Sequence, residues 1–266
     1  MAARTAQKQR ARERRLAEEQ ARAERARRER RLRMLGGVVI VAVAIVAIAI
    51  AISSGGSSPP STNPNKPGVK AAVSSVDNLL AGIPQSGNTL GSPNAKVTMT
   101  EFGDLKCPIC RDFALGPGAQ IISSDVKSGK VKLVFRSVCT ATCSGPQPGV
   151  FPTQQAAANA AGLQGKQWYY ISLFYHLQGD ETTSYVNSSF LSGIAKLIPG
   201  LDYNKWSSDA GQPSLKAQVI ADQNFANSKG YNSTPTIVVQ GPKGEAQPLV
   251  GAYPHSAYET AINSVS

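Results

Sequence analysis

The residues best suited to chemistry are two cysteines one helical turn apart, in the sequence Cys107-Pro108-Ile109-Cys110. The β-branched residues before them predict a strand and then a turn, and a helix is expected from Pro108, because proline is favoured at the first helical position. Free N–H groups and the positive dipole at the N-terminus of that helix would stabilise a Cys107 thiolate. Cys110, shielded by the helix, would close the disulfide as the resolving cysteine. The spacing therefore predicts a redox pair with Cys107 as the nucleophile.

Two other interpretations compete with redox chemistry. The pair could be half of a zinc site, but the other cysteines and the two histidines provide neither a second Cys-x-x-Cys nor a His-x-x-x-His spacing. His176 and His255 are expected to be surface or capping residues. A purely structural disulfide would explain neither the strand-turn-helix setting nor Pro108. We therefore favour a redox pair and predict no metal site.

A second pair, Cys139 and Cys143, leaves three interpretations open. On a strand the two positions would be about 13 Å apart, whereas a turn before Gly145-Pro146 brings their Cα atoms within the limit of about 7 Å for a disulfide. The first interpretation is a structural disulfide that contributes roughly 2 kcal/mol. The second is a relay that exchanges electrons with Cys107 and Cys110. The third is a copper-binding pair, for which neither histidine is suitably placed.

Four segments before and after Cys107 and Cys110 are characteristic of one protein family only when they are taken together. They are Leu90-Gly91-Ser92-Pro93-Asn94-Ala95, Gly129 to Arg136, Gly165-Lys166-Gln167-Trp168 with Leu173-Phe174, and Gly230 to Thr236. With the cysteine pair, they resemble the DsbA-like thiol:disulfide oxidoreductases, from about Leu80 to the C-terminus. The resemblance implies an α/β thioredoxin fold with a helical subdomain inserted at about 150–229. Aromatic residues of that insertion are expected in the core: Trp168, Tyr169, Phe174 and Trp206.

The resemblance also places a buried acid beneath the disulfide, at Glu101, six residues before Cys107. Burial in an apolar strand would raise the pKa of Glu101 into a range useful for moving protons to and from Cys110. From the residues alone, an exposed glutamate at the end of a strand is an equal alternative.

The segment Thr234-Pro235 resembles the loop that carries the family's cis-proline. Most X-Pro bonds are trans, so only the resemblance implies a cis bond here. The backbone of Thr234 would then lie beside Cys107 and pair with an extended substrate, as in strand addition. Pro108 and Ile109 complete the predicted substrate-binding residues.

The first 70 residues are predicted to form three segments. Residues 1–33 hold 13 of the 28 basic residues and 5 of the 17 acidic ones. Residues 34–53 form an apolar run long enough for one transmembrane helix, and residues 54–70 are a Ser/Gly/Pro-rich linker that excludes a helix. The excess of positive charge before the helix places the N-terminus in the cytoplasm and the thioredoxin-like domain, 71–266, outside. A cleaved signal peptide is the alternative, but it does not suit so long a basic segment and apolar run.

The net charge of +11 suggests a polyanion partner, but most of the excess lies in residues 1–33. A role in orienting the chain in the membrane and attraction to anionic lipid headgroups explain those charges. No aromatic residues or nucleic-acid-binding motif accompany them, so we expect no nucleic-acid partner. The hydrophobic fraction of 41% excludes both a wholly disordered chain and a disulfide-dense miniprotein.

These features predict a membrane-anchored, extracytoplasmic thiol:disulfide oxidoreductase. We expect an oxidase that introduces disulfides into reduced exported polypeptides, needs no cofactor, and is regenerated by an integral membrane redox partner. A reductase or isomerase stays open, because Pro108 and Ile109 add no positive charge beside the thiolate. The rival from another class is a non-catalytic metal carrier using Cys139 and Cys143, or a chaperone-like module.

Overall fold

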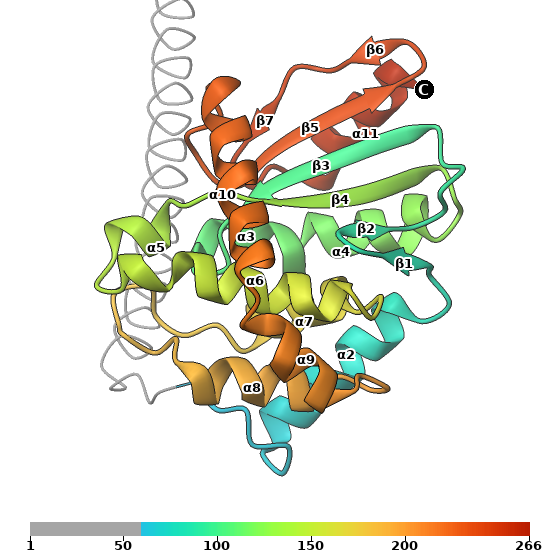
Figure 1. Cartoon of the computed structure of the whole chain (residues 1–266). Helices are drawn as coiled ribbons and strands as arrows, with labels where there is room; N and C mark the ends of the chain where they lie inside the picture. Colours follow the sequence, from blue (N-terminus) through green and yellow to red (C-terminus); the bar gives the residue numbers. More distant parts are fainter. Residues whose placement is uncertain (1–59) are drawn as a thin grey trace, which may run out of the picture. The chain divides into compact units, whose positions relative to one another are not determined.

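The structure, a computed structural model, describes residues 60–266, and it contains one β-sheet, which Figure 1 shows above helices α6 to α9 (residues 151–210). Its strand order is β1-β2-β4-β3-β5-β6, and β7 also pairs with β5. The strands are β1 (Gln85–Ser86), β2 (Thr89–Leu90), β3 (Val97–Gly103), β4 (Val131–Ser137), β5 (Thr236–Gly241), β6 (Gly244–Glu245) and β7 (Leu249–Val250). Strand β3 pairs in parallel with β4 and antiparallel with β5, so it lies at the middle of the sheet.

Helices precede, separate and follow these strands. They are α2 (Pro67–Leu80), α3 (Pro108–Leu115), α4 (Pro117–Ile121), the π-helical turn η1 (Ile122–Val126), α5 (Ala141–Ser144), the 3-10 turn η2 (Pro148–Val150), α6 (Phe151–Gly162), α7 (Gln167–His176), α8 (Ser188–Lys196), α9 (Tyr203–Ala210), α10 (Pro213–Ser228) and α11 (His255–Val265). Helices α6 to α10 lie between β4 and β5 in the chain, where the sequence predicts the insertion at about 150–229. The predicted thioredoxin fold with a helical insertion is therefore confirmed.

Of the three segments predicted at the N-terminus, the structure describes only the last part of the linker. The basic segment 1–33 and the apolar segment 34–53 lie outside the described residues. Within residues 60–266, no helix is both long enough and apolar enough to span a bilayer. The prediction that the linker 54–70 excludes a helix is wrong at its end, because α2 begins at Pro67. Proline at the first helical position loses no hydrogen bond, because that N–H has no partner within the helix.

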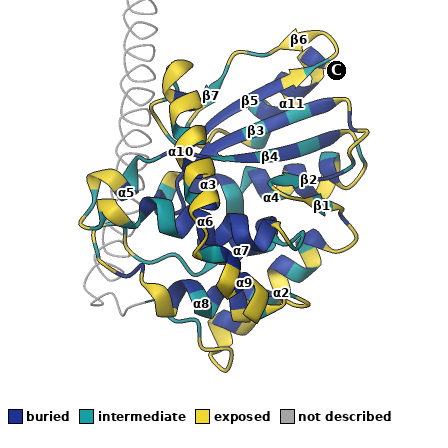
Figure 2. Ribbon diagram, in the orientation of Figure 1, coloured by how far each residue is buried: buried dark blue, intermediate teal, exposed yellow. Residues whose placement is uncertain are grey.

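Aromatic side chains join the sheet to the insertion. Phe135 of β4 meets Trp168 of α7 edge-on, with ring centroids 6.4 Å apart. The indole N–H of Trp168 donates to the carbonyl of Asn88 at 3.0 Å, so its one polar atom is satisfied. Figure 2 shows buried residues concentrated on β3, β4, β5, α6 and α7. Of the aromatic residues predicted in the core, Trp168, Phe174 and Trp206 are buried, and Tyr169 is half-buried.

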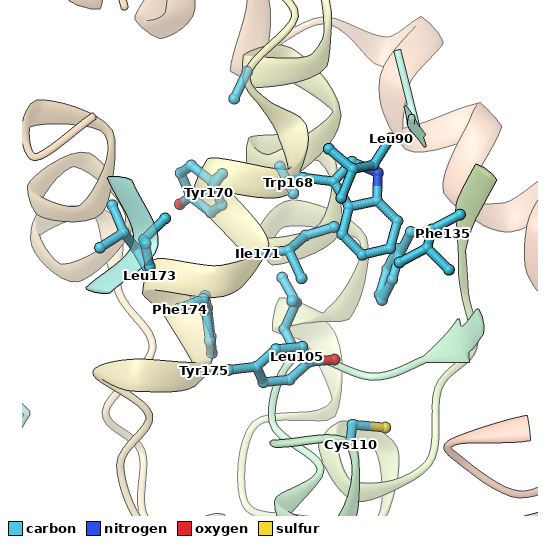
Figure 3. Close-up of a cluster of buried hydrophobic side chains, with 14 of the residues drawn as sticks. Leu90, Leu105, Cys110, Phe135, Trp168, Tyr170, Ile171, Leu173, Phe174 and Tyr175 are labelled. Atoms are coloured by element: carbon cyan, nitrogen blue, oxygen red, sulfur yellow. The ribbon is translucent and has the colours of Figure 1, made fainter. Parts of the chain in front are cut away.

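Residues of β3 alternate between two hydrophobic clusters, as side chains of a strand must. Met99 belongs to the large cluster beneath the sheet, which Figure 3 shows in part, with Cys110 at its margin. Phe102 belongs to a smaller cluster, where its ring stacks on Phe225 of α10 and lies against Tyr231. Helix α10 therefore covers the face of β3 opposite the large cluster.

We expect Phe135→Ala to lower the free energy of unfolding by about 3–5 kcal/mol, because it leaves a cavity where the sheet meets α7. Chemical denaturation would measure the change. Leu163→Ala, at a position 53% exposed, is the control and should stay within about 0.5 kcal/mol of the wild type. A similarly small effect of Phe135→Ala would show that this contact does not hold the two parts together.

Candidate active site

Cys107 and Cys110 lie at the start of α3, in the arrangement that the spacing predicts. Cys107 is the N-cap residue and Pro108 occupies the first helical position. Both cysteines are free thiols in this structure. Cys107 is 6% exposed, whereas Cys110 is fully buried and Ile109, between them, is 43% exposed. Of the two cysteines, Cys107 is therefore the one open to a reacting partner, beside the exposed Ile109.

The two thiols differ in acidity. Hydrogen bonding from the Cys110 thiol is the main cause that lowers the pKa of Cys107 to about 7, with further bonds from the side chain of Thr234 and from the backbone N–H groups of Cys110 and Ile109. Burial opposes this effect at Cys107. At Cys110, burial raises the pKa well above its usual range, and the neighbouring Cys107 adds to the shift. When the reduced pair loses one proton, the negative charge therefore resides on Cys107, and Cys110 keeps its proton.

The bond between Thr234 and Pro235 is cis, and it places the backbone of Thr234 against the nucleophile. The Cys107 thiol donates to the Thr234 carbonyl, with 3.5 Å between Sγ and O. The Pro235 carbonyl accepts from the Gly251 N–H at 2.8 Å. Among residues 60–266, no acceptor is found for the Thr234 N–H. That N–H is therefore available to another polypeptide.

Glu101 lies on the central strand and is buried beneath the cysteines. Its side chain is 4% exposed, and its Oε1 has no hydrogen-bond partner among the described residues. Burial, followed by the charge of Cys107, raises the pKa of Glu101 to about 8. Gly103 leaves room for the carboxyl group, because a Cβ there would come within 3.1 Å of Oε1 and 2.7 Å of the Phe135 ring. At neutral pH, Glu101 is therefore protonated and close to a thiolate.

Asp104, which the sequence places only in a turn, is a fully buried acceptor for the segment after β4. Its carboxylate accepts from the backbone N–H groups of Thr140 and Thr142 at 2.9 and 2.8 Å. It also accepts from the Thr142 hydroxyl at 2.5 Å and from Gln154 of α6 at 3.2 Å. The backbone carbonyl of Asp104 accepts from the Cys107 N–H at 2.9 Å. One residue thus connects the cysteine turn, the segment after β4 and the insertion.

Cys139 and Cys143 form a disulfide across the short helix α5, with their Cα atoms 5.6 Å apart. The helical turn brings the cysteines close enough, as the structural-disulfide interpretation requires. Their sulfurs are bonded to each other and are not free to bind copper in this state. Within residues 60–266, no group of three or more histidine, cysteine or acidic residues could hold a metal ion.

Two residues that the sequence analysis missed support the turn before Cys107. The Gln178 amide donates to the carbonyls of Leu105 and Cys107, at 2.7 and 3.2 Å. Lys106 is fully buried, and its ammonium group donates to the Thr183 carbonyl at 3.0 Å. Burial lowers the pKa of Lys106. A lysine beside an apolar strand signals a surface residue, and the glutamine is 71 positions away, so no sequence pattern pointed to either.

A family model described as thioredoxin matches residues 85–250, which include both cysteine pairs and the cis-proline loop. The chain belongs to the thioredoxin family. Probable disulfide bond formation protein D of Bacillus anthracis is 27% identical over 157 residues, which cover 58% of this chain and 69% of that protein. Together with the acidity of the two thiols, these matches identify a DsbA-like thiol:disulfide oxidoreductase.

Solved structures support the same fold. Oxidised BdbD from Bacillus subtilis aligns with a TM-score of 0.57 at 20% identity, covering 68% of this chain and 94% of that chain. A thioredoxin-like oxidoreductase from Silicibacter pomeroyi aligns at 0.51 and 25% identity, covering 70% and 95%. For Wolbachia pipientis α-DsbA1 the TM-score is 0.53 at 16% identity, covering 70% and 92%.

As the pH rises, titration of Glu101 is expected to lower the free energy of unfolding of the wild type. We expect Glu101→Gln to remove this decrease. In the folded chain the pKa of Glu101 is about 8, against an ordinary value of 4.5, so the folded state holds this proton more tightly than the unfolded state. The wild type therefore loses stability relative to Glu101→Gln as the pH rises from 4.5 to 8, by on the order of 5 kcal/mol.

Denaturant unfolding at pH 5 and pH 9, with Cys107 and Cys110 reduced, measures this difference. Titration of Cys107 contributes to both proteins, so comparing them removes most of its effect. Glu245→Gln on the exposed strand β6 makes the same chemical change outside the site and is the control. Equal pH dependence in the wild type and Glu101→Gln would contradict the burial of an unpartnered carboxyl group.

Proposed function

We propose that the chain is an extracytoplasmic oxidase that introduces disulfides into exported polypeptides through Cys107 and Cys110. The observation that carries the proposal is the division of charge between the thiols, which makes Cys107 thiolate a good leaving group and stabilises the reduced pair. The names of the Bacillus relatives support disulfide formation. The disulfide between Cys139 and Cys143 supports an oxidising compartment.

In the proposed reaction the Cys107–Cys110 disulfide is the oxidant. A client thiolate attacks Sγ of Cys107, a mixed disulfide forms, and Cys110 leaves with the electron pair of the broken S–S bond. A second client thiolate then attacks the client sulfur of the mixed disulfide and releases Cys107 as a thiolate. The client gains one disulfide, and the enzyme retains two electrons on its reduced pair.

Glu101 is proposed to supply the proton that the leaving sulfur of Cys110 needs. A thiolate at Cys110 is strongly disfavoured, because that sulfur is fully buried. Glu101 is protonated at neutral pH and has no competing acceptor for its Oε1 among the described residues. Proton transfer from Glu101 to Cys110 would therefore accompany the opening of the disulfide.

Clients are proposed to bind as an added strand beside Thr234. Its N–H is the donor such a strand needs, and the cis bond to Pro235 holds it next to Cys107. Pro108 and the exposed Ile109 would form the opposite side of this contact. Recognition through the main chain suits clients of unrelated sequence.

The cellular setting is also part of the proposal. Residues 1–33 would lie in the cytoplasm, 34–53 would cross the membrane once, and the linker 54–70 would carry domain 71–266 outside. An integral membrane partner would reoxidise the pair. No resident cofactor is needed, because the electrons are carried by the sulfurs.

A reductase is the second candidate, because the pKa of Cys107 is lowered only part of the way toward that of a strong oxidant. A pKa of about 7 resembles that of a reducing thioredoxin and lies well above the value of about 3.5 known for strongly oxidising cysteines. We expect a potential for Cys107–Cys110 between roughly −200 and −120 mV, measured against glutathione, whereas a value below roughly −250 mV would favour the reductase. In matching assays, an oxidase should form disulfides in a reduced protein as it refolds, and a reductase should reduce the disulfides of insulin.

We expect Cys110→Ser to accumulate a covalent adduct at Cys107 when mixed with an unfolded protein whose disulfides are scrambled. The adduct persists because the resolving sulfur is gone, and peptide mapping by mass spectrometry locates it. Cys107→Ser retains only the buried, weakly acidic Cys110 and should form no adduct. If Cys110→Ser captured nothing, or captured its partner at Cys139 or Cys143, the proposed exchange at Cys107 would be wrong.

A further inference from the structure

Two threonine hydroxyls lie one after the other in space between the second disulfide and Cys107. We call residues 139–143 the disulfide loop. Thr140 of this loop is hydrogen-bonded through its hydroxyl to the hydroxyl of Thr234. The Cys107 thiol in turn donates to the backbone carbonyl of Thr234 at 3.5 Å, and the Thr234 side chain is among the groups that lower the pKa of Cys107. Thr234 therefore connects the disulfide loop to Cys107.

The direction in which the hydrogen bonds run from Thr140 through Thr234 follows from the number of protons that these groups can donate. Each hydroxyl has one proton to donate, and a thiolate can only accept. When Cys107 is ionised, Thr234 donates its proton to the sulfur, so the hydrogen bond between the two threonines must use the proton of Thr140. When Cys107 is protonated, its thiol can donate to the Thr234 carbonyl instead. Hydrogen bonds in series strengthen one another, so Thr140 makes Thr234 a better donor to the thiolate.

The disulfide loop holds Thr140 through contacts that do not involve its hydroxyl. The Thr140 N–H donates to the buried carboxylate of Asp104 at 2.9 Å. The loop begins with the Cys139 N–H donating to Gln223 of α10 at 2.6 Å, and the disulfide to Cys143 closes it. Thr140 is therefore held on the turn that follows β3 and, through Cys139, beside α10, and its hydroxyl is presented to Thr234.

We propose that Thr140 is a positioning residue for thiol–disulfide exchange at Cys107, and that the Cys139–Cys143 disulfide serves to hold the Thr140 hydroxyl on Thr234. This inference rests on the proposed function, because it concerns the same nucleophile. It gives the second disulfide a role in the reaction without electron transfer through its sulfurs.

Other titratable groups also face Cys107, and their influence must be held constant in a test. They are Glu101 on β3, Cys110 on α3 and Tyr175 on α7. None of them contacts Thr140 through a hydrogen bond among the described residues. Variants at Thr140 therefore leave these groups in place and change only the chain of hydroxyls.

The experiment compares Thr140→Val, which removes the hydroxyl, with Thr140→Ser, which keeps it. The rate at which iodoacetamide alkylates Cys107 is followed against pH by mass spectrometry, with the Cys139–Cys143 disulfide intact. We expect Thr140→Val to raise the pKa of Cys107 by about 0.5 units, a roughly threefold lower thiolate fraction below the pKa, and Thr140→Ser to keep the wild-type value. Thr140→Ala should give the same shift as Thr140→Val and replaces it if the valine variant does not fold.

The double variant Cys139→Ser/Cys143→Ser tests the role of the loop. We expect it to raise the pKa of Cys107 as well, and Thr140→Val to add little in that background, because both changes act through one contact. Thr260→Val removes a hydroxyl that donates to the Ser256 carbonyl on α11, at 2.8 Å, and is the matched control. Unfolding midpoints establish that each variant is folded.

The outcomes separate the two proposals. A wild-type profile whose midpoint at Cys107 lies at the ordinary thiol value of 9.0 would count against the proposed function itself. A wild-type midpoint near 7 that is unchanged in folded Thr140→Val and Thr140→Ala would overturn the positioning role alone. A shift in the serine variant as large as that in the valine variant would also overturn it, since the hydroxyl would then not be the cause.

Discussion

The space beneath the start of α3 accommodates a single negative charge, and the rest of the site depends on where that charge resides. Glu101 and Cys110 are both buried, and their pKa values are raised, so each keeps its proton at neutral pH. Cys107 alone is placed to be an anion, since it receives hydrogen bonds from Cys110, Thr234 and the first N–H groups of the helix. If Cys107 loses its charge to a mixed disulfide, the constraint on Glu101 and Cys110 relaxes, and a proton can move between them.

The fold supplies this arrangement from segments that are distant in the chain. Strand β3 contributes Glu101 and the turn at Asp104, and β5 begins directly after the cis-proline. Because β3 and β5 are antiparallel neighbours, the end of one strand lies beside the beginning of the other, and Thr234 comes to lie against Cys107. The parallel partner β4 ends on the same side as β3, so the segment that follows it also reaches Asp104.

The features that could be predicted from the sequence are those that leave a pattern in neighbouring residues. The Cys-x-x-Cys pair, the strand before it and Pro108 at the first helical position all have short-range signals. The cis bond before Pro235 came only from the family resemblance. The contacts of Asp104, Thr140 and Gln178 could not be predicted, because they join residues 36 to 94 positions apart. An aspartate in a turn is ordinarily a solvent-exposed turn residue, and nothing local shows that this one accepts hydrogen bonds from a distant loop.

The two residues between the cysteines do not by themselves determine the redox potential of the pair. Pro108 and Ile109 provide no charged side chain, so the stabilisation of the Cys107 thiolate comes from backbone N–H groups, the Cys110 thiol and Thr234. Of these, only Thr234 is connected to an element outside α3, through Thr140 and the disulfide loop. Under the proposed role of Thr140, variation in that loop tunes the redox potential of Cys107 and Cys110 while leaving the cysteine motif unchanged. A site built this way adjusts that potential without altering the helix that presents the nucleophile.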